Sequence, residues 1–218
     1  MKKLLLVLSG VCILSTVFSQ TSKISMGIEI NPTVTWLSGN ILIGVEDSKF
    51  SYNSGINVNY QISTNISIKT GLSYERKGNL SSRLYLGETY METEKILLHT
   101  NFDYMILPLS GSFSFGNNVR YYMDLGAYFG YLLSNKQITE PYLDYPESEV
   151  DGLHNSNRAD YGVSVGSGIL VPVNSKLLFN IGVQSDIGLI NTSKYEVIDN
   201  GKVKTNSIAL KLGLMYKI

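Results

Sequence analysis

Apolar and polar residues alternate with a period of two along most of the chain after residue 23. In residues 24–36 every even position is apolar or proline, and the positions between them are small or polar. Such alternation indicates a β-strand with one apolar and one polar face. Seven further segments repeat the pattern, so we predict eight strands, at 24–36, 50–62, 66–75, 101–115, 119–133, 159–171, 177–189 and 208–218.

The fourth segment changes phase along its length. Phe102, Tyr104 and Ile106 lie on even positions, whereas beyond Pro108 the apolar residues lie on odd positions. A β-bulge inserts one residue into a strand, and proline is tolerated at a bulge. We therefore expect a bulge near Pro108, with Phe102, Tyr104 and Ile106 on the apolar face of the strand.

The lengths of the segments and of their connections favour a membrane barrel. Each segment has roughly 9–11 residues or more, the span of a tilted transmembrane strand, whereas soluble strands have about 5–6. Short turns at 63–65, 116–118 and 172–175 alternate with long polar connections at 37–49, 78–97, 134–157 and 190–205. This asymmetry is typical of outer-membrane barrels, whose short turns face the periplasm.

The glycines support the same fold. Most glycines within the segments lie on the polar phase, with Gly111 as an exception. Small residues suit the narrow lumen of a small barrel, and large apolar residues suit its lipid face. In a soluble lipocalin-like barrel the apolar phase would point inward instead. We predict an all-β, eight-stranded antiparallel up-and-down transmembrane β-barrel.

The N-terminus has the features of a secretory signal peptide. Lys2 and Lys3 precede an apolar run over 4–14, and we expect cleavage after Ser19. The run is shorter than the roughly 20 residues of a spanning helix. The predicted domains are a cleaved signal peptide, 1–19, and an outer-membrane barrel, 20–218. Cys12 is the only cysteine, so the mature chain would have no disulfide.

Charged residues occur on the polar, inward phase of the segments. Buried charges are costly unless they are paired, so we predict a salt-bridged network that fills the lumen. We expect Arg120 and Lys211 to be central counter-ions to Asp103, Asp124 and Asp186. A narrow pore or small-ligand barrel is the alternative, and the excess of acids would then favour cations. The predicted network comprises Glu29, Lys69, Glu75, Asp103, Arg120, Asp124, Asp160, Asp186 and Lys211.

Aromatic residues gather near the ends of the segments on the apolar phase. Tyrosine and tryptophan form girdles at the two interfaces of membrane barrels. Strand propensity alone is the alternative reason for the abundance of tyrosine. We predict interfacial positions for Trp36, Tyr60, Tyr74, Tyr131, Tyr161 and Tyr216.

Composition gives little support for catalysis, metal binding or nucleic-acid binding. Lys and Arg number 18, as do Asp and Glu, so no net charge attracts nucleic acid. The sequence 154–156 is His-Asn-Ser, but it falls in a predicted polar loop, and His99 has only Glu94 and Asp103 near it in sequence. We expect no catalytic residues, no metal and no cofactor. A lipid-modifying enzyme is the third alternative.

The predicted loop at 134–157 is acidic and aromatic. It is either a solvated charge run or a site for an ion or a partner. The expected partners are outer-membrane lipid, the barrel-insertion machinery during biogenesis, and a protein or polysaccharide at the extracellular loops. The expected role is a structural or interaction scaffold.

Several stretches resemble PorT-type outer-membrane β-barrel proteins. They are the Ser-Gln end of the signal peptide and the segments 104–109, 124–128 and 209–218. The resemblance spans about the whole mature chain and implies the barrel fold and an outer-membrane location, but no catalytic residues. Barrel proteins often end in an aromatic residue, whereas this chain ends in Ile218, with Tyr216 two positions earlier in the same phase.

Overall fold

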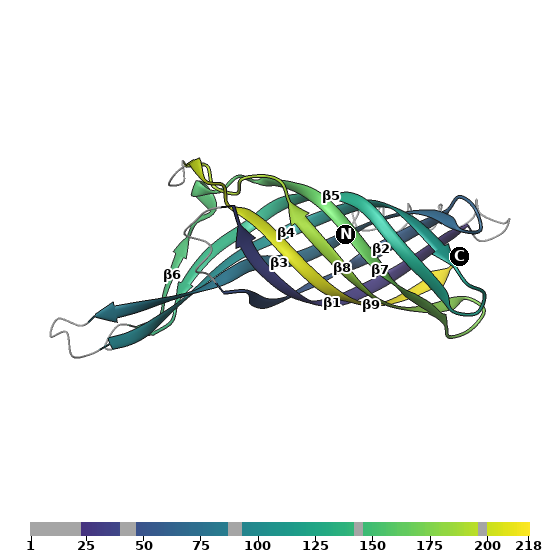
Figure 1. Cartoon of the computed structure of the whole chain (residues 1–218), viewed down its shortest axis with the longest axis horizontal. Coiled ribbons are helices and arrows are strands. Elements are labelled where there is room, and N and C mark those ends of the chain that lie inside the picture. The colour runs from purple at the N-terminus through teal and green to yellow at the C-terminus, as the bar shows by residue number, and fades with distance from the viewer. Residues whose placement is uncertain (1–22, 40–46, 87–92, 142–145, 196–199) are drawn as a thin grey trace, which may run out of the picture.

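The chain folds into a closed ring of antiparallel strands (Figure 1). The computed structural model describes residues 23–39, 47–86, 93–141, 146–195 and 200–218, with the backbone alone for 83–86 and 93–95. The predicted signal peptide lies outside the described residues. The strands are β1 (Ile24–Ser38), β2 (Lys49–Gln61), β3 (Ile66–Leu86), β4 (Thr93–Phe115), β5 (Arg120–Thr139), β6 (Ser148–Asp151), β7 (Ala159–Pro172), β8 (Leu177–Gly188) and β9 (Lys204–Lys217).

Eight of the nine described strands form the barrel. Each pairs with the next along the ring, β5 pairs with β7, and the β1–β9 pairing closes the ring. The short strand β6 lies outside the ring and pairs with β5 alone. This arrangement confirms the predicted eight-stranded antiparallel barrel.

The apolar phase of the strands faces outward. In β5, for example, Met123 and Leu125 are 63% and 66% exposed, whereas the alternate residues Tyr122 and Tyr128 are buried. An apolar outside and a polar inside invert the usual arrangement of a soluble protein. A barrel in lipid requires this inversion, and its closed ring leaves no backbone edge unpaired in the bilayer.

Two strands extend much further than the sequence predicts. The segment 78–97 was expected to be a loop, but β3 and β4 stay paired as far as Leu86 opposite Thr93. Figure 1 shows this hairpin reaching well beyond the barrel, at the end opposite the C-terminus. Outside the bilayer neither face of a hairpin has to be apolar, so its residues need not alternate although its backbone pairing continues. The period-two signal therefore ends before the strands do.

The irregularity in β4 also lies elsewhere than expected. The register with β5 shifts between Asp103 and Tyr104, which pair with Ser134 and Leu132, so Leu133 has no partner on β4. From Tyr104 to Phe115 the strand keeps a single phase. The predicted bulge at Pro108 was wrong, because it assumed that every apolar residue of β4 faces lipid.

The predicted loop 134–157 contains regular structure as well. β5 continues to Thr139, β6 pairs with its end, and a single 3-10 turn, η2, covers Leu153–Asn155. No helix in the described part of the chain is long and apolar enough to cross a membrane.

Candidate functional site

The middle of the lumen holds a layer of ion pairs. The Lys69 ammonium lies 2.8 Å from the nearer carboxylate oxygen of Asp124, and the Lys211 ammonium lies 2.7 Å from that of Glu29. The Lys69 ammonium also lies 3.7 Å from the centre of the Tyr122 ring. These groups come from β1, β3, β5 and β9, so the layer links strands that are far apart around the ring.

Amide side chains complete this layer. Asn57 donates a hydrogen bond of 2.5 Å to Glu29, and Lys211 donates one of 3.2 Å to the amide oxygen of Gln184. Beside the layer lies a cavity of about 70 Å³, bordered by Glu75 and Asp186 among others. Since one water needs about 10–15 Å³ measured in this way, the cavity has room for only a few water molecules.

A second ion pair lies toward the extracellular end. The Lys77 ammonium is 3.5 Å from a carboxylate oxygen of Asp160, and both side chains are fully buried. That oxygen also accepts hydrogen bonds from Thr205 at 3.0 Å and from Tyr128 at 3.2 Å. The Lys77 ammonium lies 4.1 Å from the centre of the Tyr128 ring. The ion pair, the hydrogen bonds to Asp160 and the aromatic face beside Lys77 offset part of the cost of burying the two charges, although the Lys77 ammonium itself has no hydrogen-bond partner among the described residues.

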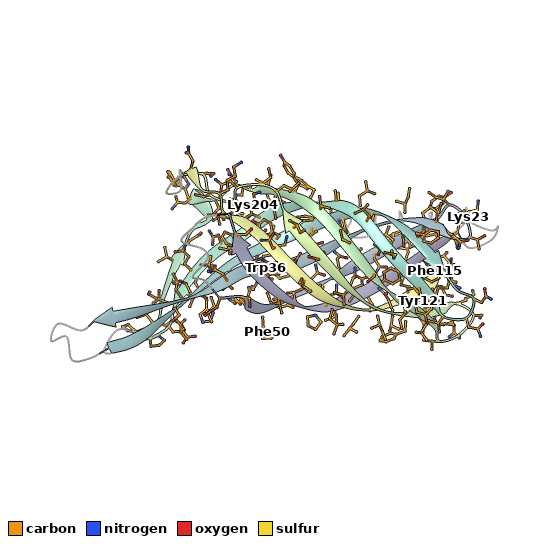
Figure 2. The ribbon with its side chains drawn as sticks, in the orientation of Figure 1. Lys23, Trp36, Phe50, Phe115, Tyr121 and Lys204 are labelled. Atoms are coloured by element: carbon orange, nitrogen blue, oxygen red, sulfur yellow. The ribbon has the colours of Figure 1, made fainter. Side chains whose placement is uncertain are left out.

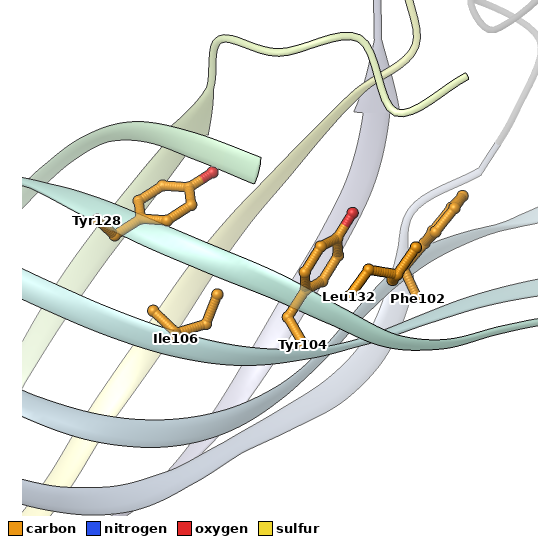
Figure 3. Packing of buried hydrophobic residues seen from close by; sticks show 5 residues of the cluster. All are labelled: Phe102, Tyr104, Ile106, Tyr128 and Leu132. Carbon is orange, nitrogen blue, oxygen red and sulfur yellow. The ribbon is translucent and has the colours of Figure 1, made fainter. Parts of the chain in front are cut away.

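Apolar side chains fill the lumen around this pair. We call them the plug; Figure 3 shows Phe102, Tyr104, Ile106, Tyr128 and Leu132, which are all buried. The half-buried Leu37 and Leu153 pack against the plug. The predicted position of Phe102, Tyr104 and Ile106 on the lipid face is therefore wrong, because these side chains point into the lumen.

The pairing of the predicted charges differs from the expected one. Asp124 pairs with Lys69, not with Arg120 or Lys211. Asp103 pairs with Arg76, whose Nε lies 2.7 Å from its carboxylate. Arg76 also donates to Tyr74 and lies over the exposed Tyr52 ring, so this pair is on the outer side of the wall and the predicted lumen position of Asp103 was wrong. Sequence separation alone could not show which charges lie at the same height, because the tilt of the strands and their register decide this.

The remaining predicted charges have other partners. Glu75 accepts a hydrogen bond of 2.8 Å from Ser207, and Asp186 accepts bonds of 2.5 Å from Ser164 and 2.9 Å from Gln184. Arg120, expected at the centre, is the first residue of β5 and lies at the short-turn end, where it donates to Ser114.

Sequence reasoning missed Arg76 and Lys77. The predicted third strand ends at Glu75. Lys77 follows Glu75 by two positions and therefore shares its inward phase. That spacing was the available signal for Lys77. Tyr104 was missed because an apolar residue inside a polar lumen leaves no sign in the alternation.

The predicted interfacial aromatics lie on the outer surface. Tyr60 and Tyr216 are about half exposed near the short-turn end, where Phe115 also stacks on Tyr121 with ring centres 5.5 Å apart. Figure 2 shows Phe115 and Tyr121 at this end and Trp36 further along the barrel. Their contact with the membrane interfaces stays a prediction, as it does for the other three: Tyr74, Tyr131 and Tyr161.

The histidines form no catalytic arrangement in the described residues. The Ser156 hydroxyl donates to the carbonyl of Gly152 at 2.9 Å and accepts from Asn135 at 2.7 Å. The His99 Nε2 lies 2.6 Å from a carboxylate oxygen of Glu140. The described residues also contain no group of three or more His, Cys, Asp or Glu placed to hold a metal.

The extracellular end carries a small sheet that continues the barrel wall. The ends of β3 and β4 pair with each other, β4 pairs with the end of β5, and β5 pairs with β6. We call these four strand ends the extracellular extension. Lys136 and Glu149 form an exposed ion pair of 2.7 Å between β5 and β6. The hydrogen bond to Glu149 raises the pKa of the Lys136 ammonium.

The closed ring, the apolar outer face and the polar lumen define a β-barrel protein of the bacterial outer membrane. Residues 18–194 match the family described as outer membrane protein beta-barrel domain. The chain belongs to this family and is located in the outer membrane. The narrower resemblance to PorT-type proteins stays a prediction.

Several solved structures are similar to this chain. Neisserial surface protein A is 18% identical with a TM-score of 0.51, and the match covers 90% of this chain and 98% of that one. Ail of Yersinia pestis is 13% identical with a TM-score of 0.43, covering 88% and 97%. OprG of Pseudomonas aeruginosa is 12% identical with a TM-score of 0.45, covering 89% and 95%. No curated protein matches the sequence.

Proposed function

We propose that this protein is an outer-membrane scaffold whose extracellular extension contacts a protein or polysaccharide partner, and that its barrel is not a pore. The observation that carries the proposal is the closure of the lumen at two levels, by the ion-pair layer and by the plug. The family and the fold are compatible with this role.

The two closures argue against a conducting path. An ion that crosses a pore needs water or polar ligands along its whole route. Here the buried Tyr104, Tyr128 and Leu132 occupy the route, and the cavity below them has room for only a few waters. For the barrel to act as the alternative, a cation-selective pore, the plug would have to move out of the route.

The extension supports the interaction role. All four residues of β6 are exposed, and β6 lies at the end of the strand order, with β5 as its neighbour. Exposed strand edges offer backbone hydrogen bonds to a partner, and the neighbouring side chains supply specificity. Val150, on β6, is 59% exposed and gives this edge an apolar contact residue.

Planar-bilayer recording tests the closure of the lumen. We expect the pure protein to give no unitary current steps over the usual voltage range. Regular steps from the wild-type protein would contradict the scaffold role in favour of the pore.

Photo-crosslinking in intact cells tests the interaction role. A photoreactive amino acid at Val150 should give a discrete adduct of higher mass with the partner. The matched control is Leu125, which is similarly apolar and exposed but lies on the outer face of the barrel wall, between Tyr121 and Tyr131 of β5. Absence of an adduct at Val150 and at neighbouring β6 positions would contradict contact with a partner at this edge.

A further inference from the structure

The barrel opens at its short-turn end into a polar cavity of about 350 Å³. We call it the periplasmic vestibule, since short turns of such barrels face the periplasm. Residues of the turns line it together with the ends of several strands. About half of its lining side chains carry a hydroxyl or an amide group, among them Ser25, Asn59, Ser67, Ser112 and Ser114.

The charges that line the vestibule all have the same sign. Four cationic side chains line it, Lys23, Lys69, Arg120 and Lys217, and no described lining residue carries a carboxylate. Of these four, only Lys69 forms an ion pair with a described residue, namely Asp124. Lys23, Arg120 and Lys217 thus bring three positive charges to one recess without an ion-pair partner among the described residues.

Arg120 is held ready for a ligand. Its guanidinium donates to the Ser114 hydroxyl at 2.6 Å and to the carbonyl of Thr64. Its Nε is buried and has no hydrogen-bond partner. A ligand cannot reach the buried Nε, so contact with an oxyanion falls to Nη1, which forms no hydrogen bond with a described residue. A guanidinium that two protein contacts already fix loses little freedom on binding an oxyanion.

The ion-pair layer forms the inner wall of the vestibule. Lys69 lines the vestibule and at the same time pairs with Asp124 in that layer. The vestibule is therefore blind, and a ligand would enter and leave from the periplasm. Its volume lies at the lower end of the range of small-molecule sites, about 300–1,000 Å³.

We propose that the periplasmic vestibule binds a small, multiply charged oxyanion, with phosphate or carboxylate groups carried on a soluble molecule. The Nη1 of Arg120 donates to one anionic group, Lys23 and Lys217 add positive charge, and the serine hydroxyls donate further hydrogen bonds. This site lies at the opposite end of the barrel from the proposed partner contact and is independent of it.

Isothermal titration of the full-length mature protein in phosphatidylcholine nanodiscs tests the site. The probes are pyrophosphate and citrate, which present the same charge chemistry as phosphate and as carboxylate. We expect at least one to bind with 1:1 stoichiometry and an affinity that falls as salt rises. Arg120→Gln should weaken binding about tenfold or more, because it removes charge-assisted hydrogen bonds. Lys217→Gln should weaken it less, since only a point charge is lost.

Lys176→Gln is the matched control. Lys176 lies at the same end of the barrel, but its ammonium packs over the outward-facing Tyr216 ring, 5.7 Å from its centre, and does not line the vestibule. The Lys176→Gln variant should bind pyrophosphate and citrate with the same affinity as the wild-type protein. Heat-modifiable gel mobility checks the fold of each variant. Should Arg120→Gln fail to fold, Lys23→Gln combined with Lys217→Gln replaces it.

Three results would overturn the proposal. The first is that neither probe binds the wild-type protein. The second is that Lys176→Gln and the vestibule variants weaken binding equally, which would indicate a general surface charge effect. The third is that an acidic peptide binds whereas both small anions fail, which would indicate a polypeptide ligand instead of a soluble small molecule.

Discussion

Lys77 and Asp160 form an ion pair in which both side chains are fully buried. Replacing one partner of such a pair leaves the other charge buried without compensation, which costs about 3–5 kcal/mol. We therefore expect Lys77→Met to lower the free energy of unfolding by about that amount. Urea unfolding in lipid vesicles, followed by the fluorescence of the single tryptophan, Trp36, would measure it.

The exposed pair Lys136–Glu149 provides the control for this prediction. Its side chains are each 48% exposed, so the pair is screened by water and contributes at most about 1 kcal/mol. Lys136→Met should unfold at nearly the wild-type urea concentration. If Lys77→Met did so too, the buried pair would not be needed to stabilise the barrel.

Two glycines show how the inward and outward faces differ at the residue scale. At Gly182 a Cβ would meet the Tyr122 hydroxyl and would lie 2.6 Å from the Ser167 carbonyl oxygen. We expect Gly182→Ala to destabilise the barrel by about 1–3 kcal/mol through overpacking. At Gly111 a Cβ would meet only the Leu125 carbonyl oxygen, at 3.9 Å. Gly111→Ala should leave the unfolding midpoint unchanged, and similar losses for both variants would refute the steric explanation.

At the scale of elements, the β3–β4 hairpin divides into a membrane part and an extracellular part. The part of the hairpin that belongs to the barrel wall includes Ile66 opposite Phe113, whereas pairs such as Ser81 opposite Leu98 belong to the protruding part. Replacing 81–98 by a two-residue turn should therefore preserve heat-modifiable mobility while it removes most of the extension. Loss of folding in this variant would show that the extension helps to close the barrel.

The same hairpin shows what the sequence could and could not predict about elements. The eight strand positions, the outward phase and the short turns followed from alternation, because the bilayer requires one apolar face per strand. The extra length of β3 and β4 had no such signal, since it lies outside that requirement. The register shift beside Tyr104 was hidden because Phe102, Tyr104 and Ile106 are apolar yet fill the lumen.

The candidate site was less predictable than the fold. Inward phase identified charged residues such as Lys69 and Asp124, but the partner of each depends on the three-dimensional register around the ring. The numbers of acidic and basic residues in the predicted network also do not show where in the lumen each kind of charge lies. Acids prevail in the predicted network as a whole, whereas the residues lining the periplasmic vestibule carry only positive charge. That segregation depends on which side chains reach each height of the lumen, which a sequence average cannot show.

For the whole molecule, the decisive property is the apolar belt that faces lipid. Leu125 is 66% exposed, lies about midway between the outward-facing Tyr121 and Tyr131 of β5, and pairs with Val165, itself 50% exposed on β7. An arginine at the middle of a barrel's lipid face costs about 2–4 kcal/mol, and the cost falls to about 0–1 kcal/mol near the interface. Leu125→Arg should therefore lower the free energy of unfolding in vesicles by about 2–4 kcal/mol.

The matched control for the Leu125→Arg variant is Val173→Arg. Val173 is also apolar and is 59% exposed in the turn between β7 and β8. Because this turn lies in water at the periplasmic end, Val173→Arg should cost almost nothing. In detergent micelles, which adapt to a charged side chain more readily than a bilayer does, the difference between the two variants should shrink. Equal stability of both variants in vesicles would mean that Leu125 does not face the hydrocarbon core, and the height at which the barrel sits in the membrane would have to be reassigned.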